Sequence, residues 1–194
     1  MTGDYVTMSK KPIGRISLLQ GILSPVYAVL GNHDHWVAAG KVRDGLEKLG
    51  YTVLQNRAVR LELKGAPLWV VGVDDGTTRH DDVAAAFQGV PDLGTRLVLT
   101  HTPTTAEKLP EGQGLACFAG HTHGGQLQIP KVTPALARLV GQPYLHGLYT
   151  VRGNTLHVTS GLGYGPGGPA VRYKMPPELA VLTLRVAPAP PSTH

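Results

Sequence analysis

The chain has 194 residues, which is enough for one domain with a sizeable hydrophobic core. Hydrophobic residues make up 42% of it and charged residues 16%, a balance that excludes an intrinsically disordered chain. The net charge of +5 suits an anionic substrate, but the basic residues are scattered, with no run longer than Lys10-Lys11, so nucleic acid is not indicated as a partner.

Apolar spacing and turn residues predict a mixed α/β fold. In the first half of the chain they indicate, in order, a short helix over 13–22, a strand over 26–30, a helix over 37–49, strands over 51–54, 59–63 and 68–73, and a helix over 81–87. In the second half they indicate strands over 96–99 and 115–119, a hairpin that joins 144–151 to 155–160, and a last strand over 179–186. We expect one domain over 1–186 and a disordered, proline-rich tail over 187–194.

The single cysteine can form no intrachain disulfide, so it does not indicate the compartment. Cys117 lies in an apolar run, so we expect a small buried side chain rather than a nucleophile. No stretch approaches the ~20 apolar residues of a membrane span, and the chain shows no secretory signal. We expect a cytoplasmic protein, unless an anchor or a signal precedes this segment in a longer chain.

The most informative motif is the stretch 120–126, which reads Gly-His-Thr-His-Gly-Gly-Gln. A neutral imidazole offers a nitrogen lone pair and is the commonest protein ligand for zinc and related metals. The neighbouring glycines let the backbone turn sharply and let an ion approach closely. Taken alone, the motif fits equally well a surface loop with two solvated histidines.

Three further motifs supply matching metal ligands in chain order. Gly3-Asp4 lies near the start, Gly31-Asn32-His33-Asp34 follows the predicted strand over 26–30, and His101 ends the run 97–101. In α/β sheets, ligands gather outside the carboxyl ends of the strands. Four such motifs, each with Asp, Asn or His, favour a metal site over a solvated loop.

With these four motifs the chain resembles the calcineurin-like metallophosphoesterases. The Gly-Gly-Gln extension after His123 is similar to the small bacterial phosphodiesterase branch, some of whose members are UDP-2,3-diacylglucosamine hydrolase-like. The resemblance implies a four-layer α/β/β/α sandwich of two mixed sheets flanked by helices. That family opens with an Asp-x-His motif on its first strand, upstream of Gly-Asp. Because Gly-Asp falls at Gly3-Asp4 here, we expect an N-terminally truncated domain with the first strand missing.

The resemblance also implies the metal ligands. Two divalent ions, whether Mn, Fe, Zn, Co or Ni, would acidify a water and clamp a phosphate ester. Asp4 would bridge the two ions, Asn32, His101 and His121 would complete the shell of one, and His123 would bind the other. The expected activity is hydrolysis of phosphomonoesters or phosphodiesters. The alternatives are a truncated, catalytically weak metal-binding fragment and, with less support, a nuclease.

The resemblance gives His33 and Asp34 a catalytic role. His33 would be a general acid or a phosphate contact, and Asp34 would hold its tautomer and raise its basicity. Asp34 could equally cap the helix that follows. The expected substrate is a small phosphorylated compound, possibly a nucleotide-sugar lipid or a phosphodiester.

Five other polar positions have simpler expected roles. We expect His35 to be a solvated loop residue and Asp74-Asp75 to form a turn or a cap. Arg172 could meet a substrate phosphate, although a surface arginine is the simpler interpretation. His80 has no motif around it and is interpreted as an ordinary residue.

Overall fold

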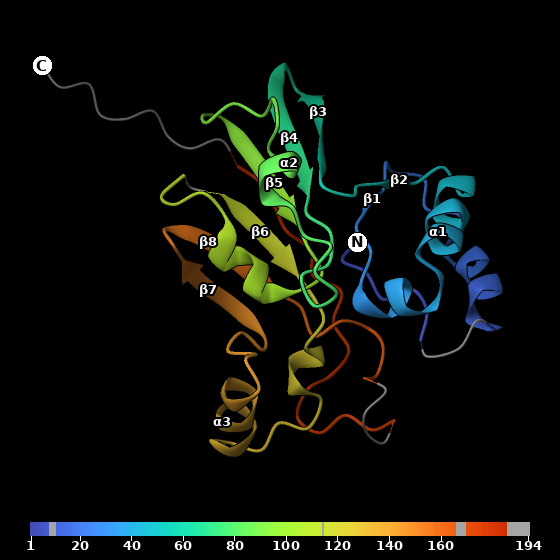
Figure 1. The fold of residues 1–194 in the computed structure, drawn as a ribbon, viewed down its shortest axis with the longest axis vertical. Helices are drawn as coiled ribbons and strands as arrows, with labels where there is room; N and C mark the ends of the chain where they lie inside the picture. Colours follow the sequence, from blue (N-terminus) through green and yellow to red (C-terminus); the bar gives the residue numbers. More distant parts are fainter. Residues whose placement is uncertain (8–10, 114, 166–169, 186–194) are drawn as a thin grey trace, which may run out of the picture.

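The computed structural model describes residues 1–7, 11–113, 115–165 and 170–185 (Figure 1). The predicted tail over 187–194 lies outside the described residues. No helix among the described residues is long and apolar enough to cross a membrane.

A mixed sheet of six strands forms the centre of the molecule, in the order β3-β4-β5-β6-β8-β7. The strands are β3 (Arg57–Leu63), β4 (Ala66–Gly72), β5 (Thr95–Leu99), β6 (Ala116–Ala119), β7 (Gly147–Val151) and β8 (Asn154–Val158). Strands β4, β5, β6 and β8 run parallel, and β3 and β7 pair antiparallel at the two edges. The parallel strands therefore end at the same side of the sheet, where the predicted ligand loops follow β5 and β6.

A second, smaller sheet pairs β1 (Tyr27–Ala28) in parallel with β2 (Thr52–Val53), and Thr2 bridges to Val29 beside it. The helical segments are η1 (Lys11–Leu19), α1 (Asn32–Lys48), α2 (Val83–Ala86), η2 (Pro103–Lys108), η3 (His123–Gly125) and α3 (Val132–Leu139). Helix α1 begins at Asn32, earlier than predicted, and is interrupted by non-helical angles at Ala38.

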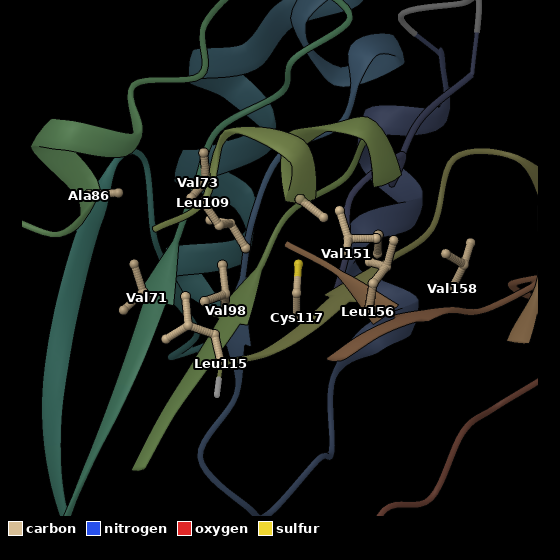
Figure 2. Packing of buried hydrophobic residues seen from close by; sticks show 12 residues of the cluster. Val71, Val73, Ala86, Val98, Leu109, Leu115, Cys117, Val151, Leu156 and Val158 are labelled. Atoms are coloured by element: carbon tan, nitrogen blue, oxygen red, sulfur yellow. The ribbon is translucent and has the colours of Figure 1, made fainter. Parts of the chain in front are cut away.

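Three apolar clusters separate four layers. Val6, Ala28, Leu30, Leu46 and their neighbours pack the small sheet against η1 and α1. Val29, Leu54 and Val70 pack the two sheets against each other. Figure 2 shows the third cluster, in which strand residues such as Val71, Val98 and Leu156 pack beneath α2 and η2. The predicted α/β/β/α sandwich is therefore confirmed.

Side-chain alternation along the strands explains why both sheets are buried on two faces. Successive residues of a strand point to opposite faces. Ala28 and Leu30 accordingly face the helices, whereas Val29 between them faces the large sheet. Val70 and Val71 divide in the same way between the inter-sheet cluster and the cluster under α2 and η2.

One prediction of secondary structure was wrong, and one helix was missed. Residues 179–185 form no strand, and Leu179 and Val181 are 79% and 88% exposed; this apolar segment pairs with no strand among the described residues. Helix α3 was not predicted from the sequence. The buried position of Cys117 is confirmed, and burial raises the pKa of its thiol to about 12.

Candidate metal centre

The four ligand loops meet at the carboxyl ends of the strands. His101 follows β5 and His121 follows β6, and these neighbouring parallel strands bring the two rings to the same edge. The Gly120 N–H donates to the His101 carbonyl at 3.1 Å and ties the two loops together. Asn32 begins α1 directly after the small sheet, and Asp4 follows the Thr2 bridge.

Four donor atoms from these loops converge on one point. Nε2 of His101 lies 3.0 Å from Oδ1 of Asn32 and 3.1 Å from Nδ1 of His121, and the last two atoms are 3.1 Å apart. Oδ2 of Asp4 lies 3.2 Å from Nε2 of His101. Asp4, His101 and His121 form one group whose ligand atoms all lie within 4.8 Å of one another.

These separations fit a divalent cation. Adjacent ligands in an octahedral shell with bonds of about 2.1 Å lie about 3.0 Å apart. Nδ1 of His101 lies 2.6 Å from the Thr2 carbonyl oxygen, so Nδ1 carries the proton that this acceptor needs and Nε2 keeps its lone pair. A backbone carbonyl that orients a metal-binding histidine in this way is the usual outer partner of such ligands. The structure thus supplies a ligand set of two imidazoles, an amide oxygen and a carboxylate.

Without a cation, the donor atoms share protons. Burial opposes the charged forms of both Asp4 and His101, but their mutual attraction holds the pKa of Asp4 below and that of His101 above its usual value. Burial, with the charge of His101 nearby, lowers the pKa of His121 to about 4. A metal cation bound here would take the place of the shared proton.

Asp34 positions Asp4 and does not contact His33 in the way we expected. Its carboxylate accepts the backbone N–H groups of Asp4 at 2.8 Å, Tyr5 at 2.9 Å, Val6 at 3.2 Å and Gly31 at 2.8 Å. The carboxylate is fully buried, and three of the four bonds join the loop 4–6 to the start of α1. The contact with Gly31, the N-cap of α1, makes the helix-capping alternative the better description of this residue.

His33 lies in the same cavity as the donor cluster. Its backbone N–H donates to Oδ1 of Asp4 at 3.0 Å, and its ring lies edge-on to Trp36 with centroids 5.0 Å apart. Among the described residues, Nδ1 of His33 is buried with no hydrogen-bond partner. The ring is therefore held by packing rather than by a carboxylate.

His123 lines the cavity but lies outside the donor cluster. Its Nδ1 is 3.5 Å from Nη2 of Arg172, and its carbonyl accepts from Nη1 of Arg172 at 3.4 Å. Arg172 also donates to the carbonyls of Ser160 at 2.8 Å and Gly161 at 3.2 Å. Arg172 thus links two loops that line the cavity through hydrogen bonds to their carbonyl groups. Burial, with Arg172 nearby, lowers the pKa of His123.

Sequence reasoning missed a buried ion pair behind the site. Nε2 of His35 lies 2.8 Å from Oδ1 of Asp74, and the two side chains are 7% and 4% exposed, so the prediction of a solvated His35 was wrong. The ring of His80 stacks on His35 at 4.0 Å between centroids. Asp75 behaves as predicted for a turn, because Oδ2 accepts the N–H of Thr78 at 2.7 Å.

The cavity that holds the cluster has a volume of about 520 Å³. Its lining combines polar groups, including His33, His101, His121 and Asp4, with apolar side chains, including Phe118, Leu162 and Leu179. A site with this lining can take a compound that combines an anionic group with an apolar or ring-shaped part.

The fold and the ligand cluster define an α/β/β/α sandwich with a candidate site for a divalent metal. No protein-family model and no solved structure matches the chain. The chain is 30% identical over 196 residues to Phosphodiesterase YaeI of Escherichia coli, covering 94% of this chain and 68% of that protein. It is 30% identical over 173 residues to the uncharacterized metallophosphoesterase YkoQ of Bacillus subtilis, covering 84% of this chain and 64% of that protein.

A more distant relative is the UDP-2,3-diacylglucosamine pyrophosphatase LpxG of Chlamydia muridarum, with 27% identity over 71% of this chain and 42% of that protein. The chain spans 64% and 60% of the length of the two Bacillus subtilis relatives named metallophosphoesterase, YkoQ and YkuE. On this evidence the chain belongs to the metallophosphoesterase family.

Proposed function

We propose that this chain hydrolyses phosphomonoester or phosphodiester bonds with the help of bound divalent metal. The observation that carries the proposal is the convergence of four donor atoms at 3.0–3.2 Å, with the proton of His101 directed away from them to Thr2. The family name of the relatives supports the same chemistry. Bound metal supplies a water made acidic near neutral pH and offsets charge on phosphoryl oxygens.

The residues around the cluster have separate roles in this proposal. Asp4, Asn32, His101 and His121 would hold the ion, and the three bonds from Asp34 to the backbone of residues 4–6 fix the position of Asp4. His33 lies beside Asp4 and lines the cavity, so its ring can present a proton to the leaving oxygen of an ester bound there.

The proposal includes a second metal ion in the same cavity. Oδ1 of Asp4 accepts the backbone N–H of His33, whereas Oδ2 faces Nε2 of His101. His123 lines the same cavity. Asp4 and His123 are the ligands we assign to that second ion. Among the described residues they offer two ligands against four for the first, so the second ion is held more weakly.

The substrate class follows from the lining of the cavity. An anionic group fits beside the histidines, and an apolar or ring-shaped part fits against Phe118 and Leu162. One relative is named a phosphodiesterase and another a UDP-2,3-diacylglucosamine pyrophosphatase. We therefore propose a small phosphorylated substrate, with a phosphodiester or a nucleotide-sugar lipid as the candidates.

The test is hydrolysis of bis-p-nitrophenyl phosphate and p-nitrophenyl phosphate by the purified chain with added Mn²⁺. We expect metal-dependent turnover that His121→Ala abolishes and His80→Ala preserves, because His80 is exposed and lies outside the cavity. A folded, metal-binding chain with no turnover of either ester would contradict the proposal and favour a catalytically weak metal-binding fragment.

A further inference from the structure

Helix α3 presents an apolar stripe to solvent next to the loop 120–126, which carries His121 and His123 and is called the metal loop below. At 100° per residue, Val132, Leu136, Leu139 and Val140 fall within one narrow stripe. They are 48%, 58%, 81% and 72% exposed, and no residue of α3 is buried. The half-buried residues Thr133, Pro134 and Ala137 lie on another face, which packs on the protein. Figure 1 shows α3 projecting from the body of the molecule beyond β7.

The stretch of sequence that contains α3 carries charge of one sign only. The sequence between Glu111 and Glu178 contains no acidic residue, whereas it contains five Lys and Arg residues. Two of these, Lys131 and Arg138, belong to α3 and its N-cap, and both are exposed. On the helical wheel they fall together on the flank of the apolar stripe. An exposed apolar stripe with a basic flank is the pattern of helices that lie in the surface of an anionic membrane.

Helix α3 is fixed to the metal loop through Thr133. The Thr133 hydroxyl accepts the N–H of Ile129 at 3.0 Å and donates to the carbonyl of Leu127. A Cβ placed on Gly125 would lie 2.6 Å from Cγ2 of Thr133, so the helix is in close contact with the Gly-Gly segment after His123. A surface that binds α3 therefore lies beside the cavity that contains the candidate metal ligands.

We propose that α3 docks on the surface of an anionic lipid bilayer, with its apolar stripe at the boundary between headgroups and acyl chains. With eight residues the helix is about 12 Å long, which suits lying in the interface and not crossing it. A second copy of the chain fits this face less well, because Lys131 and Arg138 of both copies would meet with no acidic residue in 112–177 to pair with them. The inference does not depend on the proposed hydrolysis, because docking needs neither metal nor turnover.

The test is flotation of the purified chain with vesicles of phosphatidylcholine alone or with about 30 mol% phosphatidylglycerol. We expect binding to the anionic vesicles that high salt weakens. The double variant Leu136→Gln/Leu139→Gln should reduce the partition coefficient roughly tenfold. The double variant Lys131→Gln/Arg138→Gln should reduce it about tenfold on anionic vesicles and leave it unchanged on neutral ones.

Two control double variants, both outside α3, match the test variants in the exposure of the leucines or in the charge that is removed. Leu63 and Leu93 are 53% and 84% exposed, which is similar to the 58% and 81% exposure of Leu136 and Leu139. Leu63 ends β3 and Leu93 lies shortly before β5, so neither belongs to α3. Leu63→Gln/Leu93→Gln should bind vesicles like the parent chain, and so should Lys41→Gln/Lys48→Gln, which removes the same charge from α1. Thermal unfolding followed by circular dichroism confirms that each variant folds.

Three results would overturn the inference. The first is a folded parent chain that does not float with anionic vesicles. The second is an equal loss of binding in the α3 variants and their controls. The third is a dimer in sedimentation velocity that Leu136→Gln/Leu139→Gln converts to monomer, because the stripe would then be covered by a second copy.

Discussion

Substitution of Gly31 by alanine tests whether the close approach of two loops sets the metal geometry. A Cβ on Gly31 would lie 2.2 Å from Oδ1 of Asp4 and 2.6 Å from its backbone nitrogen. The first distance falls about 0.8 Å short of the 3.0 Å below which such contacts essentially never occur. Rotation of the Asp4 side chain would itself move the metal-binding carboxylate, and it cannot relieve the second contact, because the backbone nitrogen is held by Asp34 at 2.8 Å.

The expected loss follows from that displacement. Metal ligands tolerate shifts of about 0.2 Å, so a shift of Asp4 several times larger should weaken metal binding as the loss of an outer partner does, by about tenfold to a hundredfold. Overpacking should also lower the free energy of unfolding by about 1–3 kcal/mol. Gly31 has a φ of −111°, which alanine adopts without strain, so the effect is steric.

Titration calorimetry with Mn²⁺, beside urea unfolding of the metal-free chain, measures both quantities. Gly40→Ala is the control, because Gly40 lies inside α1 with nothing within 4 Å of the added carbon. That variant should gain about 0.5–1 kcal/mol of stability and bind metal as the parent does. A folded Gly31→Ala chain with the affinity of the parent would refute the reasoning.

Three further predictions concern the site and the ion pair behind it. Calorimetry on the purified chain should give about one tightly bound Mn²⁺ per chain, because four described residues converge on one point; two tight sites would contradict our ligand assignment. His33→Ala should lower turnover by about 10²–10⁴-fold while the bound metal measured by elemental analysis stays, whereas His121→Ala should lose metal; equal metal loss in both would remove His33 from its proposed role. His35→Gln should cost about 1–3 kcal/mol of unfolding free energy at about pH 5.5. Asp74 raises the pKa of His35 against the effect of burial, so this contribution is complete below the usual histidine pKa of about 6.5 and disappears as pH rises through the raised value. Urea unfolding at about pH 5.5 and 8.5 should show the difference from the parent shrinking, and a difference that grows with pH would be inconsistent with the ion pair.

Local patterns in the sequence predicted most strands of the large sheet and a metal site at their ends, whereas the family resemblance implied the four layers and the ligand set. Runs such as Val70–Val73 are apolar on both faces, which only a strand between two layers requires. His101 and His121 each follow such a strand, so a parallel sheet brings them together without further information. The convergence of Asp4 and Asn32 on them was carried by the family resemblance.

Long-range contacts account for what the sequence did not reveal. His35 is polar and follows a metal motif, and only the fold shows that Asp74, 39 positions later, removes it from solvent. Asp34 was expected to hold the tautomer of His33 beside it, but three of the four N–H groups that it accepts come from a loop 28–30 residues away. The apolar segment Leu179 to Leu184 fits a strand by composition, yet it pairs with no strand among the described residues.

The origin of the four ligands gives the ion a mechanical consequence. Asp4 and Asn32 belong to the part of the chain that forms the small sheet and α1, whereas His101 and His121 belong to the large sheet. An ion bound by all four residues would cross-link the part of the chain that forms the small sheet and α1 to the large sheet. Metal at 1,000 times its dissociation constant would add about 4 kcal/mol to the stability of the joined state. Chelation would therefore free the first 54 residues to separate from the large sheet before the rest of the chain unfolds, and limited proteolysis in their loops would report that opening.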